Sequence, residues 1–149
     1  MYNTILVPVD GSPTSGSAVA EAGKLALMCS AHVHLLHVLD MTAYTNGFEQ
    51  AEVYFRDIKP HAIKAAEDML ARSRSLLEAS NVVVDTDLRE NLDGRVASVI
   101  VERAASLGAD VIVMGTHGRR GFERMMMGSD AELVARTSPV PVLLVKQKQ

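Results

Sequence analysis

The sequence contains no tryptophan and only one cysteine in its 149 residues, and aromatic side chains make up 4% of it. The single cysteine, Cys29, excludes a disulfide within the chain, and we expect it to be a small buried apolar side chain. Hydrophobic residues still reach 48%, so the core must consist of valine, leucine, isoleucine, alanine and methionine. This share excludes an intrinsically disordered chain, and the length fits one domain spanning residues 1–149.

Long apolar runs and an excess of positive charge are also missing. No run approaches the roughly 20 apolar residues that a membrane-spanning helix requires. The first residues lack the charged and apolar regions of a signal peptide. A net charge of −3 gives no basic surface for nucleic acid, and no basic amphipathic helix indicates a membrane surface. We therefore expect a cytoplasmic protein that binds neither nucleic acid nor membranes.

Short apolar segments alternate with helical patterns along the whole chain. The segments typical of strands covered on both sides are residues 4–9, 32–39, 81–88, 110–114 and 140–146. Helical patterns cover residues 15–29, 59–80 and 129–136, and a further one runs from Val96 to Leu107 and ends at Gly108. Residues 40–57 are predicted to form a polar loop. The alternation predicts right-handed crossovers and an α/β domain with an open, five-stranded parallel sheet covered by helices on both faces.

Two turns contain residues suited to begin a helix. Ser12 and Pro13 are predicted to be the N-cap and the first residue of the first helix. Asp93 is predicted to cap the helix that carries Val96. Pro8 is placed at the end of the first strand, where its missing N–H removes no ladder hydrogen bond.

The most informative segment follows the apolar run Val111–Met114. It reads Gly115-Thr-His-Gly118, then nine residues, then Gly128-Ser129 at the start of a helical pattern. Glycine has no Cβ and accepts positive φ, so the backbone can approach a ligand closely. The unpaired amides at a helix start bind anions. Because Asp10 and Gly115 both follow predicted strands, they are expected at the same edge of the sheet, where ligands of such folds bind.

Four segments together resemble the universal stress protein family. They are Val7-Pro-Val-Asp-Gly-Ser12, Leu36-His-Val38, the spaced glycines, and Ser138-Pro-Val-Pro-Val-Leu-Leu-Val145. The resemblance extends over essentially the whole chain. It implies a single universal stress protein domain with the strand order 3-2-1-4-5, a Rossmann-like fold similar to the adenine nucleotide alpha hydrolases. The glycine motif implies the subgroup that binds ATP.

The resemblance also implies which residues contact the nucleotide. Asp10 would lie near the ribose and adenine. Pro8 and Val9 would line the base pocket, and Val38 would form the adenine's other apolar wall. The backbone after Met114 would follow the sugar and first phosphates, and the residues from Gly128 would hold the distal phosphates. The complete set is Pro8, Val9, Asp10, Val38, Met114, Gly115, Thr116, His117, Gly118, Arg119, Gly128, Ser129 and Asp130.

Several of these residues have a second interpretation. Asp10 could simply cap the next turn through backbone amides, although the resemblance favours ligand contact. Arg119, with Arg120 and Arg124, would neutralise phosphate by bidentate contacts, or lie in a solvated loop. His117 would contact phosphate or be exposed to solvent. These alternatives stay open on the sequence alone.

Asp130 departs from the family pattern, in which an apolar or uncharged residue often follows the serine. A carboxylate in the first turn stabilises a helix but competes with a phosphate group. Either Mg²⁺ bridges the two, since it prefers oxygen ligands, or the affinity for nucleotide is reduced. We expect ATP, or another adenine nucleotide, to bind with Mg²⁺ held through the phosphates, with Asp130 as the candidate protein ligand.

Three histidines in the second predicted strand raise the question of a metal site. Strand alternation places His32 and His34 on one face and His37 on the other, so the three cannot bind one ion. We interpret them as structural, with His37 nearest the rim. No metal site formed by protein side chains is predicted.

The leading functional hypothesis is a nucleotide-binding regulatory protein and not a dedicated enzyme. The sequence has no Gly-x4-Gly-Lys-Ser/Thr loop and no evident pair of nucleophile and base, although slow ATP hydrolysis stays open. Two alternatives are a receiver domain phosphorylated on Asp10 and an interaction module that binds no nucleotide.

The last strand, within Val140–Val145, is expected at an apolar sheet edge, and the resemblance implies a homodimer through it.

Overall fold

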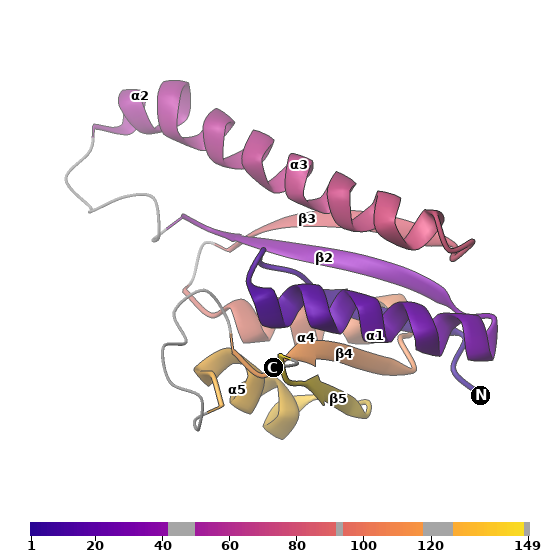
Figure 1. The fold of residues 1–149 in the computed structure, drawn as a ribbon. Helices are drawn as coiled ribbons and strands as arrows, with labels where there is room; N and C mark the ends of the chain where they lie inside the picture. The colour runs from indigo at the N-terminus through magenta and orange to yellow at the C-terminus, as the bar shows by residue number, and fades with distance from the viewer. Residues whose placement is uncertain (42–49, 92–93, 118–126, 148–149) are drawn as a thin grey trace.

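The computed structural model describes residues 1–41, 50–91, 94–117 and 127–147 and contains one five-stranded sheet in the order β3-β2-β1-β4-β5 (Figure 1). Every neighbouring pair of strands is parallel. The predicted fold class and strand order are therefore confirmed. The strands are β1 (Thr4–Pro8), β2 (His32–Asp40), β3 (Val84–Asn91), β4 (Val111–Gly115) and β5 (Val142–Val145).

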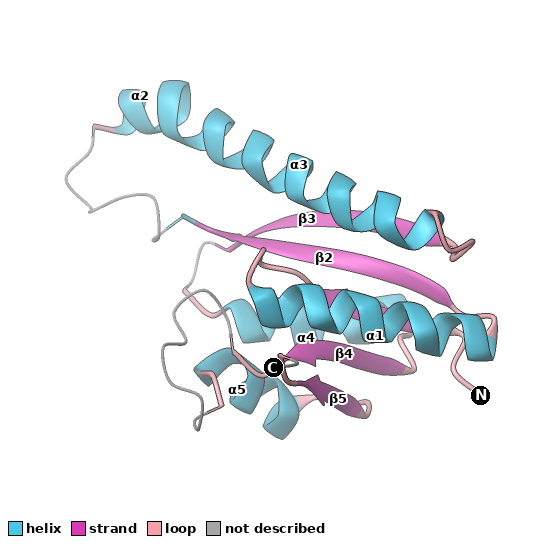
Figure 2. Ribbon diagram, viewed as in Figure 1, coloured by secondary structure: helices cyan, strands magenta, loops and turns pink. Residues whose placement is uncertain are grey.

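Helices cover both faces of the sheet (Figure 2). On one face, α1 and α3 bury an apolar cluster that includes Ile5 and Val7 of β1. On the other face, α4 and α5 bury a cluster that includes Leu6 and Leu36. Because successive side chains of β1 point to opposite faces, the strand contributes to both clusters and is apolar throughout. The helices are α1 (Pro13–Cys29), α2 (Ala51–Val53), α3 (Lys59–Glu78), α4 (Val96–Leu107) and α5 (Ser129–Thr137).

The helix that precedes β3 begins earlier than predicted. A π-helical turn, Tyr54–Ile58, joins α2 to α3, so the chain is helical from Ala51 onward and the predicted loop over residues 40–57 is wrong for this part. Tyr54 and Ile58 pack beside a small apolar cluster that contains Leu39 of β2. These buried contacts stabilise a segment whose own helical pattern is weak.

The third strand begins later than predicted, at Val84 instead of residue 81. The amides of Ser80 and Asn81 still donate to carbonyls of Leu77 and Glu78 at the end of α3. Asn81 has φ +60°, a left-handed conformation that ends the helical turn. The valines that follow Asn81 therefore complete the turn before strand pairing starts.

The predicted helix ends are confirmed where the structure describes them. Ser12 caps α1, since its Oγ accepts a hydrogen bond from the Ser15 amide at 3.2 Å, and Pro13 is the first helical residue. Gly108 ends α4 with φ +66°. Asp93 lies outside the described residues, and the residue that precedes α4, Arg95, makes no side-chain capping bond.

Cys29 is half-buried, not fully buried as predicted, and packs beside the α1–α3 cluster.

At the amino end of the sheet, one carboxylate joins two strands. Asp110 precedes β4, and its Oδ2 accepts hydrogen bonds from the amides of Asn3 and Thr4 at 2.8 and 2.9 Å. These two bonds hold the pKa of the Asp110 carboxyl below its ordinary value.

Among the described residues, no helix is long and apolar enough to cross a membrane.

Candidate functional site

The carboxyl ends of β1 and β4 and the start of α5 meet at one rim of the sheet. The amide of Val9 still donates to the Leu36 carbonyl of β2 at 2.8 Å, and the chain turns away only after it. The residues predicted to bind nucleotide lie on these three segments and on the end of β2, apart from Gly118 and Arg119, which lie outside the described residues. The topology therefore brings together segments that are far apart in the sequence, as expected for this class of fold.

Asp10 forms the first part of the rim. Its Oδ1 accepts a hydrogen bond from the Ser12 amide at 2.9 Å, and its own amide donates to Ser15 Oγ at 3.2 Å. Gly11, between them, has φ +80°, which glycine adopts without strain. The turn-capping role that the sequence allowed for Asp10 is thus present. Contact with a ligand stays a prediction.

The first turn of α1 is bonded to the segment after β4. The hydroxyl of Thr14 donates a short hydrogen bond to the His117 carbonyl, and Ser12 Oγ donates to the same oxygen at 3.5 Å. The sequence analysis did not identify Thr14. Its only signal in the sequence is a hydroxyl in the first turn of the helix that follows strand β1.

Gly115 is explained by this same contact. A Cβ at this position would lie 2.7 Å from Thr14 Oγ1 and 2.8 Å from the Thr14 carbonyl carbon. Neither Gly115 nor Gly128 uses the positive φ that glycine can adopt, and Gly128 is extended at φ −63°. The missing Cβ of Gly115 allows β4 to approach α1, and this approach sets the position of the backbone that follows.

The start of α5 returns to the end of β4. The Gly128 amide donates to the Thr116 carbonyl at 2.7 Å, while the Thr116 amide donates to the Val145 carbonyl of β5 at 3.0 Å. Gly128 is the N-cap of α5 and provides no side-chain capping bond. Among the described residues, no side chain therefore caps the first amides of this helix. These amides lie at the rim, beside the Thr116–His117 backbone.

His117 is held in place and is not a solvent-exposed turn residue. Its Nδ1 lies within hydrogen-bond distance of Thr116 Oγ1, at 2.9 Å. Its Nε2 is buried and has no hydrogen-bond partner among the described residues.

The apolar residues at the rim belong to two different clusters. Val9 packs with the α1–α3 cluster, while Val38 and Met114 pack with the α4–α5 cluster. Val9 and Val38 therefore pack with clusters on opposite faces of the sheet, and their contact with the adenine stays a prediction. Pro8 is partly exposed and, by strand alternation, lies on the Val38 side.

His37, the histidine nearest the rim, has a structural role. It is buried, and its Nδ1 donates to the Val9 carbonyl across 2.6 Å. This bond fixes the backbone at the end of β1. The interpretation of His37 as a structural residue is consistent with this position.

Acidic residues surround the open end of α5. Ser129 and Asp130 are exposed at its first positions, and Glu132 lies in the same first turn. The amide of Glu132 donates to the Gly128 carbonyl at 2.9 Å, which begins the helical bonding. The Ser129 hydroxyl and the Asp130 carboxylate thus lie within one helical turn, an oxygen-rich set of the type that Mg²⁺ prefers.

Comparison with protein families decides between the classes of α/β fold. The model of the universal stress protein family matches residues 1–146. The chain belongs to the universal stress protein family. Universal stress protein MJ0531 of Methanocaldococcus jannaschii is 33% identical over 147 residues, which cover 99% of this chain and 84% of that protein.

Solved structures of the family agree with this fold. MJ0577 of Methanocaldococcus jannaschii aligns with a TM-score of 0.85 at 28% identity, over 100% of this universal stress protein and 99% of that chain. Two further family structures align at 23% identity. One was solved in complex with cAMP (TM-score 0.68, 99% of this chain and 98% of that one). The other, from Archaeoglobus fulgidus, was solved with dAMP (TM-score 0.69, 97% of this chain and 98% of that one).

Proposed function

We propose that this universal stress protein binds an adenine nucleotide, ATP with Mg²⁺, at the carboxyl rim of its sheet and acts as a regulatory protein. One observation carries the proposal: the start of α5, which no described side chain caps, lies beside Thr116 and His117. The hydrogen bond from the Gly128 amide to the Thr116 carbonyl holds it there. The cAMP and dAMP complexes of the two family structures support an adenine nucleotide as the ligand class.

The start of α5 is suited to a phosphate group for a simple electrostatic reason. The partial positive charge at a helix start favours an anion by about 0.3–1 kcal/mol for each interaction, and by more where the site is partly buried. Gly128 presents only backbone there, so no cap side chain competes for the first amides.

Mg²⁺ would resolve the conflict between a phosphate and the carboxylate of Asp130. Asp130 is exposed in the first turn of α5, so its carboxylate is accessible to a hydrated ion. Mg²⁺ usually keeps several waters and binds through one or two carboxylates together with phosphate oxygens. We therefore expect Asp130→Asn to weaken the Mg²⁺ dependence of ATP binding while ATP binding without metal becomes stronger, both measured by titration calorimetry.

The described residues of the rim offer groups that would bind a nucleotide and no evident group that would react with it, which supports a regulatory role. Backbone amides and hydroxyls at the rim hold an anion without activating a nucleophile, and the Asp10 carboxylate accepts the Ser12 amide. Slow hydrolysis would need only a water positioned against a metal-bound phosphate. We expect phosphate release from Mg·ATP to be far slower than release of the intact nucleotide, which a single-turnover assay compares directly.

The decisive experiment is stabilisation by ligand. Mg·ATP at one hundred times its dissociation constant should add about 2.7 kcal/mol to the free energy of unfolding. Gly118→Val and Gly128→Val should abolish this gain, while circular dichroism shows a folded protein. If neither Mg·ATP nor any other adenine nucleotide shifts unfolding, the interaction module that binds no nucleotide becomes the better hypothesis.

We also propose a homodimer through the last strand. β5 is at one edge of the sheet, and the side chain of Leu143 within it is 41% exposed. An apolar edge strand presents unpaired backbone groups that a second copy can cover. Sedimentation of the purified protein tests this state directly.

A further inference from the structure

Two histidines and one carboxylate converge on the sheet at the end opposite to the rim. His32 and His34 lie at the start of β2, and Asp85 lies at the start of β3. The parallel register places His34 beside Asp85, so all three side chains lie on the face covered by α4. Strand alternation places His37 on the opposite face from His32 and His34. Asp85 of the neighbouring strand β3 lies beside the two histidines instead.

The distances among the three side chains are those of a metal-ligand set. His32 Nε2 lies 3.1 Å and His34 Nδ1 3.9 Å from the same oxygen, Asp85 Oδ2. One ligand atom from each of the three residues lies within 4.8 Å of the others. Tetrahedral zinc, with bonds of about 2.0–2.2 Å, requires ligand atoms about 3.3 Å apart, so small side-chain rotations are sufficient.

Hydrogen bonding does not explain this arrangement. Within the part of the chain that the structure describes, buried His32 Nε2 has no hydrogen-bond partner, because its approach to Asp85 has the distance of an ion pair without hydrogen-bond geometry. Burial and the neighbouring His32 hold the pKa of His34 below its ordinary value.

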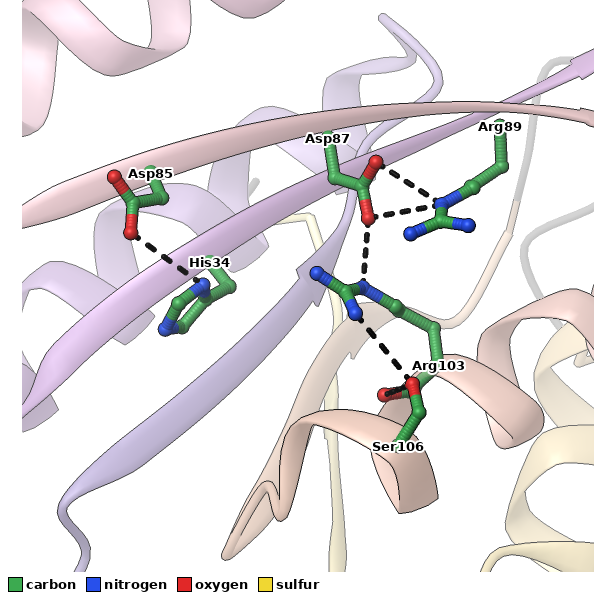
Figure 3. Close-up of polar contacts among 6 residues, drawn as sticks. All are labelled: His34, Asp85, Asp87, Arg89, Arg103 and Ser106. Atoms are coloured by element: carbon green, nitrogen blue, oxygen red, sulfur yellow. Dashed lines mark hydrogen bonds and ion pairs between the residues drawn. The ribbon is translucent and has the colours of Figure 1, made fainter.

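The adjacent charges are already paired with one another. Asp87, two residues along β3, binds Arg103 of α4 at 2.6 Å and Arg89 at 3.1 Å, and Arg103 also reaches Ser106. Figure 3 shows this network beside the His34–Asp85 contact. Asp87 is paired with both arginines, and the Asp85 carboxylate lies against the two histidines. Its side chain is 62% exposed, so an ion and its waters have access from solvent.

We propose that His32, His34 and Asp85 bind one divalent transition-metal ion of the zinc type, with water in the remaining position. Two imidazole nitrogens and one carboxylate oxygen suit zinc, cobalt or nickel, whereas Mg²⁺ prefers oxygen ligands alone. The ion would join β2 to β3, which is an edge strand of the sheet. This site lies at the amino end of β2 and is independent of the proposed nucleotide site at the carboxyl rim.

The test is zinc binding to the full chain without an affinity tag and without nucleotide, because a triphosphate itself binds Zn²⁺. Calorimetry of the chelator-treated protein should give one Zn²⁺ per chain. His32→Gln, His34→Gln and Asp85→Asn should each weaken binding at least about tenfold, since even indirect supports of metal ligands change affinity by 10–100-fold. Co²⁺ should give visible absorption bands of a low-coordinate site, and Mg²⁺ should not compete.

The matched control is His61→Gln, which removes an exposed histidine of α3 outside the cluster and should leave zinc affinity unchanged. Asp85→Asn changes an exposed strand residue and keeps the test valid if a histidine variant fails to fold. The proposal is overturned if no site of one ion per chain exists. It is equally overturned if the three substitutions change affinity no more than His61→Gln does.

Discussion

Replacing Gly115 by alanine tests whether this glycine serves the fold or the ligand. The new Cβ would lie 2.7, 2.8 and 2.9 Å from Oγ1, the carbonyl carbon and Cβ of Thr14, all closer than side chains tolerate. Two of these atoms belong to or adjoin the backbone of α1, and Thr14 is only 7% exposed, so rotation of a side-chain tip cannot relieve the clash. Either β4 or the first turn of α1 must move.

The expected cost follows from overpacking. Insertion of one methyl group into a closed contact typically destabilises a protein by about 1–3 kcal/mol. For a chain of this size, each kcal/mol corresponds to a decrease of about 2–4 °C in the midpoint of thermal unfolding. Since the bond from Thr14 to the His117 carbonyl spans the same contact, we also expect the rim to shift and the affinity for Mg·ATP to fall.

The control is Gly16→Ala in the exposed part of α1, where an added Cβ meets nothing within 4 Å. Alanine there should stabilise the protein by about 0.5–1 kcal/mol, because glycine is unfavourable inside a helix. Denaturant unfolding of both variants and nucleotide titration measure the two effects separately. If Gly115→Ala unfolds like the wild type but no longer binds nucleotide, the glycine serves ligand approach and our explanation is wrong.

Three further predictions concern other parts of the fold. The bonds that lower the pKa of Asp110 stabilise the folded protein fully above the ordinary pKa of an aspartate and are lost as the pH falls through the folded value. The stability deficit of Asp110→Asn, measured by urea unfolding, should therefore be present at neutral pH and shrink in acid; a constant deficit would contradict this. Leu143→Lys should shift sedimentation toward the monomer, and an unchanged dimer would exclude β5 as the interface. Ser12→Ala should cost about 0.5–2 kcal/mol through the lost cap, whereas Ser17→Ala on the exposed face of α1 should not destabilise, as thermal unfolding will show.

Local signals in the sequence were sufficient for the architecture. The apolar residues of β1 and β4 predict strands buried on both faces, and the alternation with helices predicts a parallel sheet. Ser12 and Gly108 mark helix ends through interactions with their immediate neighbours, so they were identified correctly. The family resemblance added the strand order, which local patterns do not contain.

Contacts between distant segments were not predictable in the same way. The need for Gly115 arises from Thr14, a residue on another element, and nothing near either residue in the sequence indicates the contact. The pairing of His34 with Asp85 depends on the register of two strands separated by a long helix. The helical residues after Ala51 were assigned to a loop because their stabilising contacts come from the cluster around Leu39.

The bonds around Thr116 have a consequence for how proteins of this architecture can diversify. His117 is anchored through its carbonyl, and Gly128 through its amide, so at these two positions the bonds use backbone groups that do not depend on the side chain, proline at 128 excepted. Exchange of the residues between these ends, or a change in their number, leaves the anchoring bonds available, because loop length alters closure entropy only slowly. The bonds at these two ends should therefore form with different sequences between them, and chimeras that exchange residues 118–126 between relatives should fold alike.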